Sequence, residues 1–175
     1  MGKIKDIYSQ VLTAQVQVAI GADEARYVAF TDAYKPEDKT GFVIHLVEYN
    51  FENPLTLQLD SAERYKFGLS FLQVHPTGGM EANDPGVLDH NSISRNDLGT
   101  AAMAIFEKNP LVVKDFSSWP GGGLLVHPVN LFAWGYTDQA LATQIIQHTI
   151  MHYRVIDLTP DLYAELWQSI YIRQV

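Results

Sequence analysis

The chain has 175 residues, which is long enough for one domain with a substantial hydrophobic core and short for two. Hydrophobic residues make up 47% of it, which predicts a packed globule, and the absence of cysteine excludes disulfides and thiolate metal ligands. The formal net charge is −8, whereas a nucleic-acid-binding surface usually brings a basic excess, so we expect no direct binding to nucleic acid.

The first predicted element, over residues 1–13, is an N-terminal arm or a short amphipathic helix. Its apolar residues with helical spacing are Ile4, Ile7, Tyr8, Val11 and Leu12. The opening residues lack the continuous apolar core of a signal peptide, and no run approaches the ~18 apolar residues of a membrane span.

From residue 14 onward the hydrophobic pattern changes to a period of two, which predicts β-strands. Val16 and Val18 share one face of the strand 14–20, and Gln15 and Gln17 share the other. Further strands are predicted at 26–32, 42–51, 55–59 and 65–74. In the strand 42–51, uninterrupted alternation places His45, Val47 and Tyr49 opposite Phe42, Ile44 and Leu46. In the last strand, Gly68 indicates a bulge or a bend.

Residues 75–97 are rich in proline, glycine and acidic or amide side chains, and we expect a long loop there. Within residues 81–97, the oxygen-bearing side chains are Glu81, Asn83, Asp84, Asp89, Asn91 and Asp97. Their density is compatible with a calcium site, but Ile93 stands where an EF-hand needs an oxygen ligand. Solvated turn residues are the default interpretation, and the question of calcium stays open.

The remaining elements are two helices and four strands. Helical spacing of apolar residues predicts a helix at 98–108, ended by Asn109 and Pro110. Strands follow at 111–116, 123–127, 130–136 and 143–156. The chain closes with a helix at 158–170, in which Thr159 is the expected N-cap and Pro160 takes the first helical position. Many short strands with glycine and proline between them predict an all-β fold, an antiparallel sandwich or barrel.

The sequence offers little support for catalysis. His148 and His152 form an H-x-x-x-H pair, but on a strand they would lie ~13 Å apart and could not chelate one ion. A cupin-like barrel enzyme is the third and least favoured interpretation, because the chain has no His-x-His pair and His127 does not fit the second cupin motif. We therefore expect no enzyme, no catalytic or metal-binding residue and no cofactor.

The segment 116–136 reads FSSWPGGGLLVHPVNLFAWGY. We predict a corner between strands, in which the glycines supply positive φ and close backbone approach. The expected structural turn residues are Pro120, Gly121, Gly122, Gly123 and Pro128. The candidates for contact with a ligand or a neighbouring subunit are Trp119, Trp134 and Tyr136. Stacking of these rings on sugars would make the protein a carbohydrate-binding sandwich such as a lectin or fibre domain, which is the alternative function.

The C-terminal part, mainly residues 111–170, resembles the end of viral single jelly-roll capsid proteins. The resemblance lies in the glycine-marked segment, the long strand ending in Met151-His152-Tyr153-Arg154-Val155-Ile156, and the helix that follows Leu158-Thr159-Pro160. It implies a single antiparallel jelly-roll sandwich of about eight strands over residues 14–175, with two or three short helices. It also implies a virion shell protein that assembles with copies of itself and with other capsid proteins.

One departure from such capsid proteins is informative. Many small ones carry a long Arg/Lys-rich arm against the genome, and this chain has none. Neutralisation of the genome would then come from another component. A membrane beneath the shell, a separate basic protein or an empty lattice would each be compatible with this, and in the first case the chain would lie against the membrane.

Overall fold

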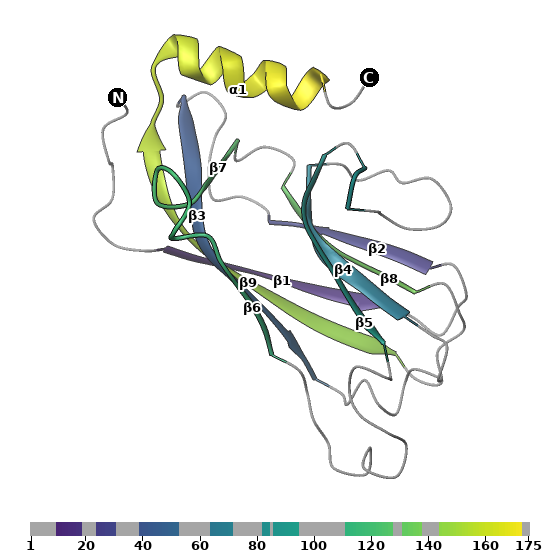
Figure 1. Cartoon of the computed structure of the whole chain (residues 1–175). Helices are drawn as coiled ribbons and strands as arrows, with labels where there is room; N and C mark the ends of the chain where they lie inside the picture. Colours follow the sequence, from purple (N-terminus) through teal and green to yellow (C-terminus); the bar gives the residue numbers. More distant parts are fainter. Residues whose placement is uncertain are drawn as a thin grey trace.

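The structure is a computed structural model that describes residues 10–18, 24–30, 39–52, 64–71, 82–84, 86–94, 111–127, 131–137 and 144–172. These residues form two antiparallel sheets and one helix (Figure 1). Sheet A consists of β1 (Gln10–Val18), β3 (Thr40–Phe51), β6 (Val112–Asp115), β7 (Leu124–Val126) and β9 (Ile145–Asp157). Sheet B consists of β2 (Glu24–Ala29), β4 (Arg64–Ser70), β5 (Val87–Ser94) and β8 (Phe132–Thr137). The helix α1 spans Pro160–Ile172.

The strands pair in a nested order along the chain. β1 pairs with β9, β2 with β8, β3 with β6 and β7, and β4 with β5. Two further pairings, β3 with β9 and β4 with β8, complete the sheet orders β1-β9-β3-β6 and β2-β8-β4-β5. β6 and β7 lie against successive parts of β3, so together they occupy one strand position, which a loop interrupts.

The core lies between the two sheets. In β1, Ala14, Val16 and Val18 are buried while Gln15 and Gln17 are exposed, which confirms the alternation predicted from the sequence. In β9 the odd-numbered residues from Ile145 to Val155 are buried in the same way. These buried side chains face sheet B, and burial of each large apolar one stabilises the fold by about 1.5–3 kcal/mol.

Aromatic rings join the two layers. The ring of Tyr49 on β3 meets Phe67 on β4 edge to face at a centroid distance of 5.0 Å. Phe51 meets the same Phe67 ring at 5.3 Å, and Tyr65 at 5.8 Å. Such geometry places the positive edge of one ring against the negative face of another, which adds stabilisation beyond area burial. The predicted all-β sandwich of antiparallel sheets is therefore confirmed.

β3 departs from the predicted alternation. Its register with β9 shifts between Ile44 and Leu46, which is the signature of a β-bulge. As a result Phe42 and Ile44 before the bulge and Val47 and Tyr49 after it are all buried. The prediction that these residues divide between two faces was wrong, because one extra residue in a strand reverses the direction of the side chains that follow it.

A short polar network also crosses the core. The Tyr65 hydroxyl on β4 donates to Oε1 of Gln147 on β9 at 2.7 Å, and Nε2 of Gln147 donates to the Thr149 hydroxyl at 2.8 Å. Gly135 makes room for it, because a Cβ at that position would collide with the Tyr65 hydroxyl. Burial raises the pKa of Tyr65, so the hydroxyl stays protonated and remains a donor.

Two element predictions need correction. Val11 and Leu12 belong to strand β1 and not to a helix, so the predicted boundary at residue 13 falls inside a strand. Residues 87–94, predicted as loop, form strand β5 at the edge of sheet B. The strand predicted at 55–59 and the helix predicted at 98–108 lie outside the described residues.

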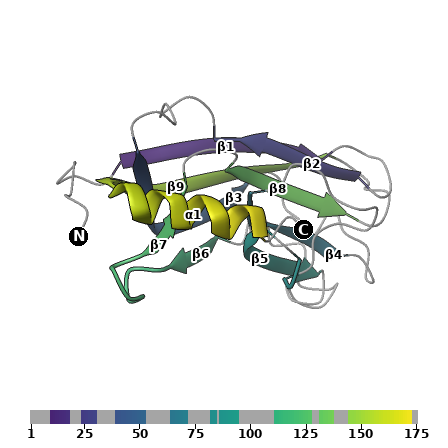
Figure 2. The same cartoon turned by 90° about the horizontal axis from the view of Figure 1, so that it is seen from above.

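The predicted C-terminal helix is confirmed as α1. The backbone N–H of Leu162 donates to the Thr159 hydroxyl at 3.3 Å, as an N-cap requires. Just before the helix, Leu158 is buried and packs over Gly41 of β3, which fixes where α1 begins. Figures 1 and 2 show α1 (yellow) lying across one end of the two sheets. Within the described residues, no helix is both long and apolar enough to cross a membrane.

Candidate functional site

The loop 116–123 connects β6 to β7, and it lies opposite the β3 bulge. On the β6 side, the backbone N–H of Phe116 still donates to the carbonyl of His45 at 2.9 Å. On the β7 side, a Cβ at Gly123 would lie 2.5 Å from the carbonyl oxygen of Ile44. The strands on both sides of the glycine segment pair with β3. The segment is therefore a loop that interrupts a single strand position of sheet A.

Two consecutive turns shape this loop. The backbone N–H of Trp119 donates to the carbonyl of Phe116, and that of Gly122 donates to the carbonyl of Trp119, both at 2.9 Å. Pro120 is the second residue of the latter turn and Gly121 the third, with φ of 87°, which is the pattern of a type II turn. Gly122 has φ of 78°, in the left-handed region that favours glycine. Pro128 lies outside the described residues.

The three aromatic contact candidates have different surroundings. Trp119 is 47% exposed, and its ring meets the ring of Phe116 edge to face at 5.1 Å. Trp134 and Tyr136 are buried together in a cluster separate from the main core. Gly68 of β4 lies against the Trp134 indole, because a Cβ there would be 3.2 Å from its Nε1. Of the three rings, Trp119 alone is open to solvent.

The histidines that the structure describes do not gather into a metal centre. His127 is buried beside Tyr163 of α1, with ring centroids 5.2 Å apart, and its burial lowers its pKa to about 4. On the outer face of sheet A, His148 pairs with Glu52 at 2.6 Å and His152 with Glu48 at 2.8 Å. The chain segments described by the structure contain no group of three or more histidine or carboxylate side chains that could hold a metal ion.

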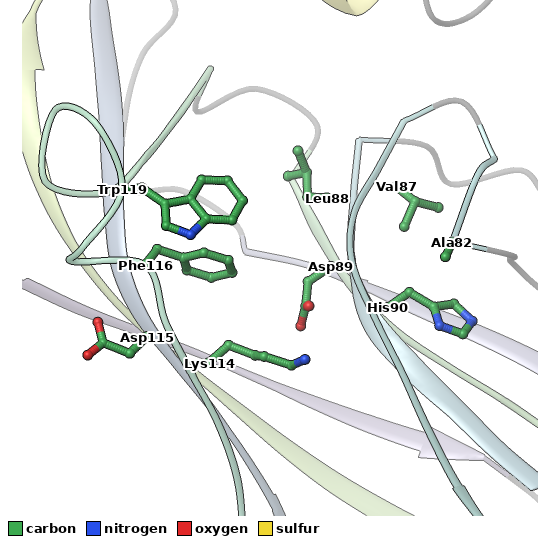
Figure 3. A pocket seen from close by; sticks show the side chains of 9 residues that line it. All are labelled: Ala82, Val87, Leu88, Asp89, His90, Lys114, Asp115, Phe116 and Trp119. Carbon is green, nitrogen blue, oxygen red and sulfur yellow. The ribbon is translucent and has the colours of Figure 1, made fainter.

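A cleft of about 380 Å³ lies between β5 of sheet B and the β6 segment of sheet A. Its lining residues are Ala82, Val87, Leu88, Asp89, His90, Lys114, Asp115, Phe116 and Trp119. Figure 3 shows Trp119 and Phe116 on one side, Asp89 and Leu88 on the other, and Lys114 reaching across between them. The His90 ring and the Asp115 carboxylate point away from the space between these side chains (Figure 3).

Asp89 is held in a fixed position within this cleft. Its Oδ2 accepts hydrogen bonds from the Tyr49 hydroxyl and from Nδ2 of Asn91, both at 2.7 Å. Tyr49 lies on β3 and Asn91 on β5, so the carboxylate is anchored to both sheets. Burial, together with the negative charge of Asp89, raises the pKa of Tyr49 well above its ordinary value. The Tyr49 hydroxyl therefore remains a donor throughout the physiological range.

Lys114 brings a positive charge to the same space. It alternates with the outward-facing Val113 and Asp115 along β6, so its side chain points inward over the cleft (Figure 3). In the described part of the chain its ammonium forms no ion pair. The cleft thus combines a carboxylate acceptor, an ammonium donor and an exposed indole, which is a set suited to holding a small polar molecule.

Of these three residues, Trp119 was predicted from the sequence as a contact residue, Asp89 was predicted only as a possible calcium ligand, and Lys114 was not predicted. The sequence predicts Asp89 and Asn91 in a solvated loop for which calcium binding is open. In the structure both lie on β5, and Nδ2 of Asn91 donates a hydrogen bond to Oδ2 of Asp89. The alternation in 111–116 already puts Val112 and Lys114 on one face and was the available signal for Lys114. No family model matches this chain, and no curated protein matches its sequence.

Proposed function

We propose that this protein is a viral shell protein built on a single jelly roll. The nested pairing of strands is the observation that carries the proposal. A jelly roll has eight strand positions in two sheets, arranged as two Greek keys. With β6 and β7 counted as one position, the described strands occupy eight, in orders that bring the first strand beside the last.

The resemblance of residues 111–170 to jelly-roll capsid proteins supports the same proposal. Its parts correspond to β6, the glycine loop, β7, β8, β9 and α1, which run consecutively along the chain. A fold alone does not dictate function, so the surfaces of the sandwich must also suit assembly.

Exposed apolar side chains lie at both edges of sheet A. Val11 on β1 is 51% exposed, and Val113 on β6 is 46% exposed. β1 and β6 are the two ends of the sheet order, so contact between unlike edges of neighbouring copies would continue from copy to copy. Such heterologous contacts build rings or open arrays. The partners would be copies of this chain and other shell proteins, and the chain would lie against a membrane beneath the shell.

The test is the mass and shape of the purified protein. Light scattering and negative-stain electron microscopy should find closed or sheet-like particles many times heavier than the 19.6 kDa chain. The variant Val113→Lys should shift the population toward small species, because it places a charge in an apolar contact. Gln168→Lys, which adds the same charge at an exposed position of α1 and on neither edge strand of sheet A, is the matched control and should assemble as the wild type does.

A strictly monomeric protein at high concentration, without particles at low or high salt, would contradict the shell function. Equal loss of assembly in Val113→Lys and Gln168→Lys would contradict the edge contact and leave the shell function standing.

A further inference from the structure

We propose that the cleft between β5 and β6 is a binding site for a neutral sugar, with Trp119, Asp89 and Lys114 as its recognition residues. This site is independent of assembly, because Lys114 and Trp119 line the cleft while Val113 faces outward from sheet A. Three features of the cleft support a sugar as the ligand: the exposed indole, the anchored carboxylate and the balance of charge.

The indole of Trp119 supplies a stacking surface. It is 47% exposed, and its edge-to-face contact with Phe116 holds it in place. The type II turn that follows fixes the backbone beside it. A pyranose ring carries C–H groups on one face, which pack against an aromatic ring, and a tryptophan fixed in this way loses little side-chain entropy on binding.

Asp89 and Lys114 supply complementary hydrogen bonds. An ionised carboxylate only accepts and an ammonium only donates, whereas each sugar hydroxyl does both. Oδ2 of Asp89 is already occupied by Tyr49 and Asn91, which orients the carboxylate so that its Oδ1 is available to a ligand. Figure 3 shows the carboxylate and the Lys114 side chain directed into the same space, so neighbouring hydroxyls of one sugar ring could bridge them.

The charge balance selects a neutral ligand. One carboxylate and one ammonium point into the cleft, whereas Asp115 and His90 point away from it (Figure 3). Their fields oppose each other, and the chain as a whole is acidic, so an anionic sugar gains nothing and is repelled at long range. The volume of about 380 Å³ lies within the range of small-molecule sites and suits one or two sugar rings.

The experiment is a titration of the purified full chain with the methyl glycosides of glucose, galactose, mannose and N-acetylglucosamine. Saturation-transfer NMR reports binding of every ligand, and tryptophan fluorescence also reports binding of the sugars. N-acetylneuraminic acid tests an anionic sugar and free tryptophan tests an amino acid as the ligand, the latter by NMR alone. We expect saturable binding of at least one neutral glycoside, with a Kd on the order of 1 mM.

The variants assign that binding to the cleft. Trp119→Ala and Lys114→Met should each weaken binding about tenfold or more. Val113→Ala, on the same strand but facing outward, should bind as the wild type does. Because both cleft variants alter side chains that reach the surface, circular dichroism and the unfolding midpoint should show that they remain folded.

The proposal is overturned if none of the neutral glycosides binds saturably. It is also overturned if Trp119→Ala binds the sugar as tightly as the wild type, or if N-acetylneuraminic acid or free tryptophan binds more tightly than every neutral glycoside. None of these outcomes bears on particle formation, so the test is separate from that of the shell function.

Discussion

At the scale of single residues, the three consecutive glycines have different roles. Gly121 and Gly122 have positive φ in open space, so a Cβ there would meet no atom within 4 Å and its main cost is backbone strain. Gly123 lies against β3, where a Cβ would be 2.5 Å from the Ile44 carbonyl oxygen and 2.8 Å from Val43. The sequence indicated that glycine was needed here, but not which of the three was sterically required.

We therefore predict that Gly123→Val destabilises the fold more than Gly122→Val. Left-handed strain alone costs about 1–3 kcal/mol and applies to Gly122→Val, while Gly123→Val adds a backbone collision. Urea unfolding, compared through the free energy at equal m-values, measures both. Equal loss in the two variants would show that the segment does not pack on β3 as described.

A second residue-scale prediction concerns His127. Its pKa is lowered to about 4 by burial, below the ordinary value of 6.5. Between these two pH values the unfolded chain binds the proton and the folded chain does not, so stability falls as pH falls from 6.5 to 4. The loss attributable to His127 should be about 3 kcal/mol, and it should be absent in His127→Phe.

The measurement is the free energy of unfolding of both proteins from pH 8 to pH 4. The two curves should run parallel above pH 7, where the histidine is neutral in both states, and separate below. His45, whose pKa is also lowered mainly by burial, remains in both proteins and contributes the same slope to each. Parallel curves down to pH 4 would mean that His127 is accessible to solvent in the folded state.

At the scale of elements, the Tyr65–Gln147 hydrogen bond joins the two sheets inside the core. Tyr65→Phe leaves the buried Oε1 of Gln147 without its donor and should cost about 1–3 kcal/mol. Tyr153→Phe is the matched control, because its hydroxyl donates to the half-exposed Gln10, whose oxygen can turn to water. A loss in Tyr65→Phe no greater than that in Tyr153→Phe, measured by urea unfolding, would contradict a sealed polar bridge.

Sequence periodicity predicted the elements whose inward faces are apolar. β1 and β9 alternate cleanly, and their buried residues were assigned correctly. β5 was not predicted because Asp89 and Asn91, which are poor strand formers, take inward positions. The Asp89 carboxylate there accepts hydrogen bonds from Tyr49 and from Asn91. The β3 bulge was missed because no glycine marks it, and only the register with β9 reveals it.

At the scale of the whole molecule, periodicity predicts which side of a strand is buried but not which strand lies beside it. The pairing of Gln10 with Tyr153 joins residues 143 positions apart, and no local pattern encodes such a partner. For the same reason the cleft could not be predicted. Asp89 and Lys114 come from different sheets, and they meet because β5 and β6 border the same side of the sandwich.

The pairing of the first strand with the last carries the shell proposal, and engineered disulfides test it most directly. The natural chain has no cysteine, so Thr13→Cys with Ile150→Cys introduces a single thiol pair at positions that are partners in the β1–β9 register. Paired residues on antiparallel strands lie within disulfide reach. Thr13→Cys with Ile146→Cys, displaced along the strand by ~13 Å, is the control.

Peptide mapping after mild oxidation should find the intramolecular disulfide in the first variant and not in the second. Absence of the bond in the first variant, or equal yields in both, would contradict the nested fold.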